Sequence, residues 1–273
     1  MSSKALFIVE GIRREKDFFL RIQEAFHLDM EIVPFCGNIS MLYDEMARTE
    51  FLSDVRKLLL AKTTDSGQRE VLQATYSDIY MIFDLDPQHG VVQQEGESVE
   101  AALRRNAECV FGKALEMASR LNNSTDPTLG KLYINYPSIE SFRDADDFFD
   151  PQYSSRFVPL GELCRQFGGC GYKSISSRGR LAQGKHLSGY SERDFSRLAT
   201  MNVYKLKRVV DGLWDALPYD EFRTKSDQSF VLRKQREIVR SDLSLGVLNT
   251  SLFFLFDYKG EAYYNQSVAE VGR

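Results

Sequence analysis

The sequence of 273 residues is poor in cysteine, histidine and tryptophan, and it contains no long hydrophobic run. Because no 18 consecutive residues are apolar, we expect no membrane-spanning helix and no membrane partner. The N-terminal MSSKALF lacks the layout of a signal peptide, which predicts a cytoplasmic protein. No C-x-x-C pair occurs, so we expect reduced cysteines that mostly serve in packing, rather than a disulfide or zinc framework, at Cys36, Cys109, Cys164 and Cys170.

The sequence also lacks the positive net charge of a protein that is basic throughout, since its formal net charge is −4. The charge is nevertheless uneven along the chain. Nine lysines and arginines lie between residues 173 and 208 with only two acids, whereas residues 140–150 contain five acids and one arginine. The first of these segments can attract polyanions, and the second can hold cations.

Apolar segments of strand length alternate with amphipathic helical segments along the first half of the chain. We expect strands over residues 4–10, 30–35, 78–86 and 131–137, and helices over residues 13–26, 40–62 and 99–121. This alternation favours an α/β fold with a mainly parallel sheet flanked by helices. Ligands of such sheets bind at the carboxyl ends of the strands.

The second half is less regular and more basic. Helical patterns cover residues 191–217 and 230–243, after a segment rich in glycine, serine and basic residues. We therefore divide the chain into an α/β domain, 1–145, and a mostly helical basic region, 146–273, suited to binding a substrate or a partner. The apolar run SLFFLFDYKG, residues 251–260, indicates a terminal strand or a hydrophobic docking patch, and a patch of this kind suits a homo-oligomer.

Three acids stand where two of the expected strands end. Glu10 ends the first strand, and Asp84 and Asp86 end the third. Residues two apart on a strand point to the same side, so both aspartates can face one hard cation such as Mg²⁺. Acids at strand ends also cap helices, and a D-x-D pair is common by chance. The three together favour a metal site, because a divalent ion relieves the repulsion between converging carboxylates.

FIVEG followed by IFDLD resembles the Rossmann-like TOPRIM fold of topoisomerases, DnaG-type primases, OLD-family nucleases and small ribonucleases. The resemblance covers residues 1–145. It implies that Glu10 is the catalytic acid/base or a metal ligand and that Gly11 makes the tight turn after it. It further implies that Asp84 and Asp86 bind Mg²⁺ or Mn²⁺.

A second segment, YINYPSIESF, resembles part of the small RloB-like and AbiL-like TOPRIM proteins of anti-phage systems. This resemblance implies that Glu140 is a fourth carboxylate of the same site. Those relatives often have E-G-x-T-E after the first strand. Here the sequence is EGIRRE, which lacks the threonine and places Glu15 one position later.

The resemblance and the acids together predict an Mg²⁺-dependent endonuclease that hydrolyses phosphodiester bonds in tRNA, other RNA or DNA, with a metal-activated water as nucleophile. Tyr172 and Tyr190 flank the basic segment and can stack on unpaired bases, with ordinary surface tyrosines as the alternative. Basic residues are expected to bind backbone phosphates, with a solvated surface or local ion pairs as the alternative. They are Arg13, Arg14, Lys173, Arg178, Arg180, Lys185, Arg193 and Arg197.

Other functions stay open at this point. A D-x-D glycosyltransferase would hold Mn²⁺ and a nucleotide sugar on Asp84 and Asp86, but it leaves Glu10 unexplained. A phosphatase of the haloacid-dehalogenase type would carry D-x-D on its first strand. The protein can also be an interaction module or an inhibited effector, because the resemblance implies a partner ATPase that senses infection and releases the nuclease. The chain contains no P-loop, so that ATPase would be a separate protein.

Overall fold

The computed structural model describes residues 4–51, 54–126, 128–144, 156–177 and 186–271. Its strands are β1 (Ala5–Val9), β2 (Met30–Pro34), β3 (Asp78–Asp84), β4 (Asn122–Asn123) and β5 (Gly130–Asn135). They form one sheet in the order β2-β1-β3-β5-β4, in which only β4 is antiparallel to its neighbour. The mainly parallel sheet predicted from the sequence is therefore confirmed.

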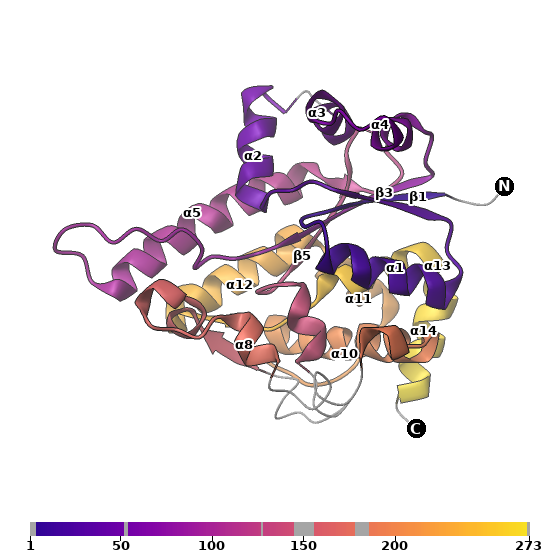
Figure 1. Ribbon diagram of the computed structural model, residues 1–273. Coiled ribbons are helices and arrows are strands. Elements are labelled where there is room, and N and C mark those ends of the chain that lie inside the picture. The colour runs from indigo at the N-terminus through magenta and orange to yellow at the C-terminus, as the bar shows by residue number, and fades with distance from the viewer. Residues whose placement is uncertain (1–3, 52–53, 127, 145–155, 178–185, 272–273) are drawn as a thin grey trace.

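Helices cover both faces of this sheet (Figure 1). The first half supplies α1 (Arg14–Phe26), α2 (Ile39–Arg48), α3 (Val55–Lys62), α4 (Ser66–Gln73) and α5 (Val99–Arg120). Figure 1 shows α1 on one face and α2 to α5 on the other. The single helix expected over residues 40–62 is interrupted, because Glu50 and Phe51 adopt positive φ angles of 51° and 58°. Asp54 then starts α3 by accepting a hydrogen bond from the Arg56 N–H.

The second half of the chain is mostly helical. Its helices are α7 (Leu160–Leu163), α8 (Tyr172–Ser176), α10 (Glu192–Asp211), α11 (Tyr219–Lys225), α12 (Gln228–Asp242), α13 (Phe254–Lys259) and α14 (Glu261–Val271). Among the residues described in this half, 3₁₀ helices join them at η1 (Ile139–Arg143), η2 (Arg165–Phe167), η3 (Leu187–Gly189) and η4 (Thr250–Phe253). β6 (Phe157–Pro159) and β7 (Ser244–Gly246) form a separate antiparallel pair.

The apolar run at residues 251–260 is neither a strand nor an exposed patch. It folds as η4 and α13, and its apolar side chains from Leu252 to Phe256 are buried. Phe254 packs against Phe7 of β1, with ring centroids 4.8 Å apart, and against Phe19 of α1 at 5.9 Å. The run is apolar because it forms the core between the sheet and the C-terminal helices, which removes the observation that favoured a docking surface.

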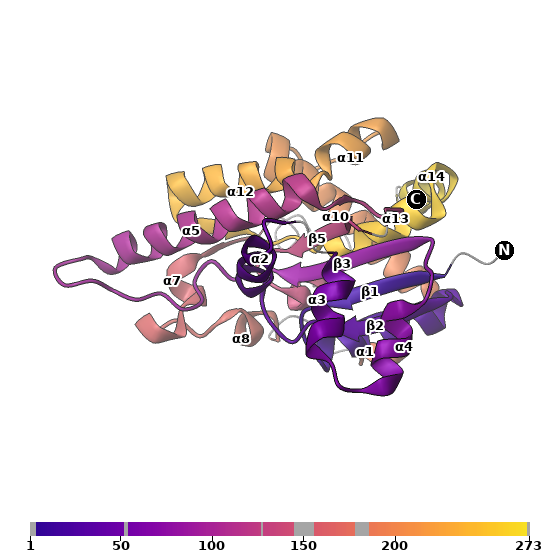
Figure 2. The same cartoon turned by 90° about the horizontal axis from the view of Figure 1, so that it is seen from above.

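Within the described ranges, no helix combines the length and the apolar character that a membrane crossing requires. The longest helix, α5, carries charged residues along its whole length. Figure 2 shows α5 and α12 running side by side, and Glu108 of α5 accepts hydrogen bonds from Arg236 and Arg240 of α12. Both helices are thus amphipathic covers of the sheet.

Candidate active site

The carboxyl ends of β1, β3 and β5 bring polar side chains together at one edge of the sheet. Val9 pairs with Ile82 and Asp84 pairs with Asn135, so Glu10 emerges level with the end of β3. The Asp84 N–H donates a hydrogen bond of 2.9 Å to Glu10 Oε2. The Asn135 side-chain amide donates one of 3.1 Å to Asp84 Oδ1. Glu10 and Asp84 are therefore positioned by adjacent strands, as the sequence predicted.

Asp86 lies just beyond β3, in the turn that leads away from the sheet. Its Oδ1 accepts a hydrogen bond of 2.9 Å from the Gln88 side-chain amide, and its carbonyl accepts one from the His89 N–H. The other side-chain atom of this amide, Gln88 Oε1, is buried and has no partner among the described residues. A buried carbonyl oxygen without a donor is costly, so it marks a position suited to a cation or a water molecule.

Glu140 reaches the same edge from η1, the 3₁₀ helix that follows β5. Its side chain is nearly buried and forms an ion pair with Arg14 at the start of α1. The Ser138 hydroxyl donates a hydrogen bond of 2.7 Å to Glu140 Oε2. The acid predicted from the resemblance thus lies beside the strand ends, and a basic residue predicted to bind phosphate is its partner.

A buried polar cluster fixes η1 in place. Asp144, directly after η1, accepts a hydrogen bond of 3.1 Å from the Tyr172 hydroxyl on its carboxylate. The Lys205 ammonium of α10 donates a hydrogen bond of 2.9 Å to the Asp144 carbonyl. Lys205 is only 1% exposed, and burial lowers its pKa to about 8. These contacts hold the Glu140 backbone against the C-terminal helices.

The acids at this edge resist ionisation. Burial raises the pKa of Glu10 to about 8, and repulsion from Asp86, Glu15 and Glu140 adds to the effect. Burial, followed by repulsion from Glu10 and Asp86, raises the pKa of Asp84 well above its usual range. Burial likewise raises the pKa values of Asp86 and Glu15. The cluster contains more carboxylates than nearby cations, which is the condition that a divalent ion relieves.

The donor set fits Mg²⁺ or Mn²⁺, because carboxylate and amide oxygens are the ligands that hard cations prefer. In the described part of the chain, however, no group of three or more His, Cys, Asp or Glu side chains is already arranged to hold an ion. One oxygen of Glu10 is engaged by the Asp84 N–H, and Glu140 is paired with Arg14. Binding of an ion therefore requires these acids to exchange partners.

The strand ends open into a cleft of about 530 Å³, hereafter the carboxylate cleft. Asp84, Asp86 and Glu140 line it, whereas Glu10 is not among the lining residues and contacts the Asp84 backbone N–H. The opposite wall comes from the segment that follows α7 and from the start of α8, and it includes Arg165 and Lys173. Figure 2 shows α7 and α8 beyond the carboxyl ends of the strands. Acids and bases therefore face each other across one cleft.

The predicted phosphate-binding residues do not form a single surface. Arg14 and Lys173 line the carboxylate cleft, and Arg13 is exposed at the start of α1. Arg193 lines a separate depression beside α14, and Arg197 of α10 is partly buried and engaged within the chain. The remaining three lie outside the described residues: Arg178, Arg180 and Lys185.

The prediction that two tyrosines stack on bases is wrong. Tyr172 is 5% exposed and Tyr190 is 1% exposed, so neither offers a ring face to solvent. Tyr190 instead packs against Phe142 and Phe195. Glycine and serine around these tyrosines suggested an exposed loop, but both rings belong to the core.

Several residues of the site were not predicted as functional. Glu15 lines the carboxylate cleft, and a Cβ atom on Gly11 would lie 2.4 Å from Glu15 Oε2, so Gly11 is needed for this close approach. The departure from E-G-x-T-E was the available signal for Glu15. Asn135 and Gln88 carry no motif, and only the contacts with the two aspartates identify them.

The cysteines are free thiols, and three of them do not serve in packing. Cys164 is buried beside the carboxylate cleft, as expected of a packing residue. The other three are exposed, at Cys36, Cys109 and Cys170. Single small apolar side chains are common at helix and loop surfaces. The sequence therefore could not distinguish the exposed cysteines from the buried one.

The site thus rests on its own geometry. When the chain is compared with models of protein families, with curated proteins and with solved structures, nothing matches it.

Proposed function

We propose that the protein is an Mg²⁺-dependent endonuclease of the TOPRIM type, which hydrolyses phosphodiester bonds in RNA or DNA. One observation carries the proposal. Carboxylates with raised pKa values line one wall of the carboxylate cleft, and Arg165 and Lys173 line the other. A cleft that presents acids for a cation and bases for a phosphate suits metal-assisted phosphoryl chemistry better than binding of a neutral ligand.

Residues in and beside the cleft receive separate roles in this proposal. Glu10, Asp84, Asp86 and Glu140 hold the cation, which when bound supplies Lewis-acid activation of water and neutralises charge on the phosphate. Asn135 and Ser138 orient the carboxylates that they contact. Lys173 and Arg165 hold the backbone phosphate from the opposite wall.

In this proposal Arg14 has two alternative partners, the Glu140 carboxylate and the phosphate of the substrate. It neutralises Glu140 in the absence of a cation, as the ion pair shows. Glu140 would exchange Arg14 for a bound cation, and the Arg14 guanidinium would then be available to a phosphate in the same cleft. The exchange costs little because one positive charge replaces another beside a buried carboxylate.

The family resemblance extends the proposal beyond the site. It supports a cytoplasmic effector of anti-phage defence that a partner ATPase holds inactive until infection. A non-catalytic module of such a complex is the alternative. The contact between Glu10 and Asp84 favours the nuclease over a D-x-D glycosyltransferase, because that enzyme needs no acid from the first strand.

The test is a cleavage assay on tRNA, circular single-stranded DNA and plasmid, each with Mg²⁺, with Mn²⁺ and with EDTA. The variants are Glu10→Gln and Asp84→Asn, and the matched control is Glu261→Gln, an exposed acid on α14. We expect metal-dependent cleavage by the wild type and by Glu261→Gln and its loss in the other two. Equal cleavage by Glu10→Gln, or no cleavage of any substrate, contradicts the catalytic role.

Calorimetric titration with Mn²⁺ examines the cation site separately from catalysis. We expect binding by the wild type and by Glu261→Gln, and at least a tenfold weaker affinity in Asp84→Asn, which loses a charged oxygen ligand. Binding without cleavage would support the non-catalytic module. Absence of Mn²⁺ binding would remove both the nuclease and the glycosyltransferase.

A further inference from the structure

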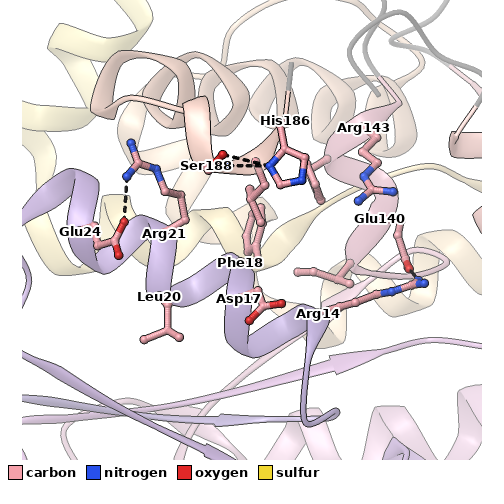
Figure 3. A pocket seen from close by; sticks show the side chains of 13 residues that line it. Arg14, Asp17, Phe18, Leu20, Arg21, Glu24, Glu140, Arg143, His186 and Ser188 are labelled. Carbon is pink, nitrogen blue, oxygen red and sulfur yellow. Dashed lines mark hydrogen bonds and ion pairs between the residues drawn. The ribbon is translucent and has the colours of Figure 1, made fainter. Parts of the chain in front are cut away.

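A second cavity, hereafter the side cavity, adjoins the carboxylate cleft and lies between α1, η1 and η3. Its volume is about 430 Å³, within the range of about 300–1,000 Å³ that is typical of sites for small ligands. Arg14 and Glu140 line both this cavity and the carboxylate cleft. The ion pair between them therefore forms the partition between the two, and Figure 3 shows it at one end of the side cavity.

The interior of the side cavity is apolar. Phe18 of α1, Phe142 of η1 and Leu187 of η3 contribute its walls. In Figure 3, Phe18 points from α1 toward η3, between the labelled charged residues. Arg21 ties α1 to the end of η3, because its guanidinium donates hydrogen bonds of 2.8 and 2.6 Å to the Tyr190 carbonyl. The cavity is thus held open by contacts within the fold.

The rim of the side cavity carries cations and one acid that has no partner. The Arg143 guanidinium lies over the Phe142 ring, 5.3 Å from its centroid, and forms a planar cationic surface. Glu24 and Glu140 are neutralised by Arg21 and Arg14. Among the described residues, the Asp17 carboxylate has no hydrogen bond or ion pair, and it lines the same cavity.

These features identify the kind of group that fits. Arg143 would attract a phosphate, but Asp17 would repel it, and Phe18 and Leu187 would add nothing to its binding. A planar heterocycle gains from the apolar walls, stacks on a guanidinium plane and offers N–H groups to a carboxylate. A nucleobase has all three properties. If the backbone of a strand crosses the carboxylate cleft, one of its bases reaches the ion pair of Arg14 and Glu140 that separates the two cavities.

We propose that the side cavity binds one unpaired nucleobase of the nucleic acid, so that the protein acts on strands whose bases are free of a complement. A base within a duplex cannot enter, because its hydrogen-bonding edge and both its faces are occupied. This inference rests on the proposed function for the path of the backbone. The binding of the base itself is measured without cleavage, which keeps the two ideas separable.

The experiment measures binding by fluorescence anisotropy in EDTA, where no cleavage occurs. The probes are a fluorescein-labelled twelve-residue oligoadenylate, its blunt duplex, and a twelve-unit backbone of abasic sites with the same charge. We expect the oligoadenylate to bind about tenfold more tightly than the abasic backbone and the duplex, as stacking of one base predicts. Equal affinity for all three probes overturns the proposal.

Two variants locate the effect. Ser188→Trp fills the side cavity without changing its charge, and Ser119→Trp places the same side chain on exposed α5 as the control. Arg143→Ala removes the stacking surface and serves if Ser188→Trp does not fold. We expect Ser188→Trp and Arg143→Ala to bind the oligoadenylate severalfold to tenfold more weakly than Ser119→Trp does. Unchanged affinity in both folded variants overturns the proposal.

The outcomes also separate this proposal from the nuclease. If Ser188→Trp loses base-dependent binding while the wild type cleaves nothing with Mg²⁺, the side cavity binds bases and the proposed nuclease is wrong. If cleavage requires Glu10 but Ser188→Trp binds and cleaves single strands like the wild type, the nuclease stands and the base site is wrong.

Discussion

Replacement of Glu10 by glutamine removes one ionisable group from the buried cluster while it keeps the shape of the side chain. The glutamine oxygen can still accept the hydrogen bond from the Asp84 N–H, which the wild-type carboxylate accepts at 2.9 Å. The pKa of Glu10 is about 8 in the folded protein and 4.5 in an unperturbed chain. The folded state therefore binds the proton more tightly than the unfolded state does.

The sign and size of the effect follow from this difference. As the pH rises above 4.5, the unfolded chain releases the proton and the folded protein keeps it, so the free energy of unfolding falls until the pH passes 8. At about 1.4 kcal/mol per tenfold change, Glu10 costs the metal-free protein up to about 2 kcal/mol at pH 6 and about 4 kcal/mol at pH 8. Glu10→Gln removes that cost, which corresponds to a melting temperature roughly 8 °C higher at pH 8.

The assay is thermal and urea unfolding of the wild type, Glu10→Gln and Glu261→Gln in EDTA, at intervals from pH 5 to pH 8.5. We expect Glu10→Gln to gain stability over the wild type steadily as the pH rises, and Glu261→Gln to follow the wild type. A Glu10→Gln protein that is less stable than the wild type at pH 8, or a difference that does not change with pH, would refute the reasoning.

Three further predictions concern the same region. Mg²⁺ at a hundred times its dissociation constant should raise the free energy of unfolding of the wild type by about 2.7 kcal/mol. Thermal scans with and without EDTA should therefore show a higher melting temperature with Mg²⁺, and a smaller rise in Asp84→Asn. Arg14→Met should lower the Mn²⁺ concentration needed for half saturation, because Glu140 loses its competing partner, and it should weaken oligonucleotide binding; unchanged values for both would contradict the exchange of partners. Burial lowers the pKa of Lys205 to about 8 from 10.5, so the wild type should gain up to about 3 kcal/mol relative to Lys205→Met as the pH rises from 8 to 10.5, measured by urea unfolding.

The sheet and part of the site could be predicted because they depend on short-range patterns. Strand-length apolar runs alternating with helical stripes specify a parallel sheet, and the ends of such strands meet at one edge. This is sufficient to bring Glu10 and Asp84 together without knowledge of tertiary contacts. The position of Glu140 followed from its resemblance to a motif rather than from any periodicity.

The remaining features depend on long-range packing, which the patterns do not encode. The ion pair between Arg14 and Glu140 joins residues 126 positions apart and forms only because η1 folds back over the start of α1. A short apolar run such as 251–260 has no period that separates a buried helix from a strand. Burial of Tyr190 likewise results from its neighbours Phe142 and Phe195, which approach it only in the folded chain.

Asn135, which holds Asp84, also accepts a hydrogen bond of 3.2 Å from the Ser251 N–H of η4, 116 positions further along the chain. The Thr250 hydroxyl of η4 accepts a hydrogen bond from the Ile134 N–H and donates one to the Ile134 carbonyl. In a genetic screen for loss of function, substitutions that remove the Thr250 hydroxyl would score with those at the acids, although no motif marks this residue. At Ser251 only proline would remove the backbone N–H that donates to Asn135. A graft of the first half onto another scaffold would have to include η4, because Asn135, which orients Asp84, is itself held by a residue of η4.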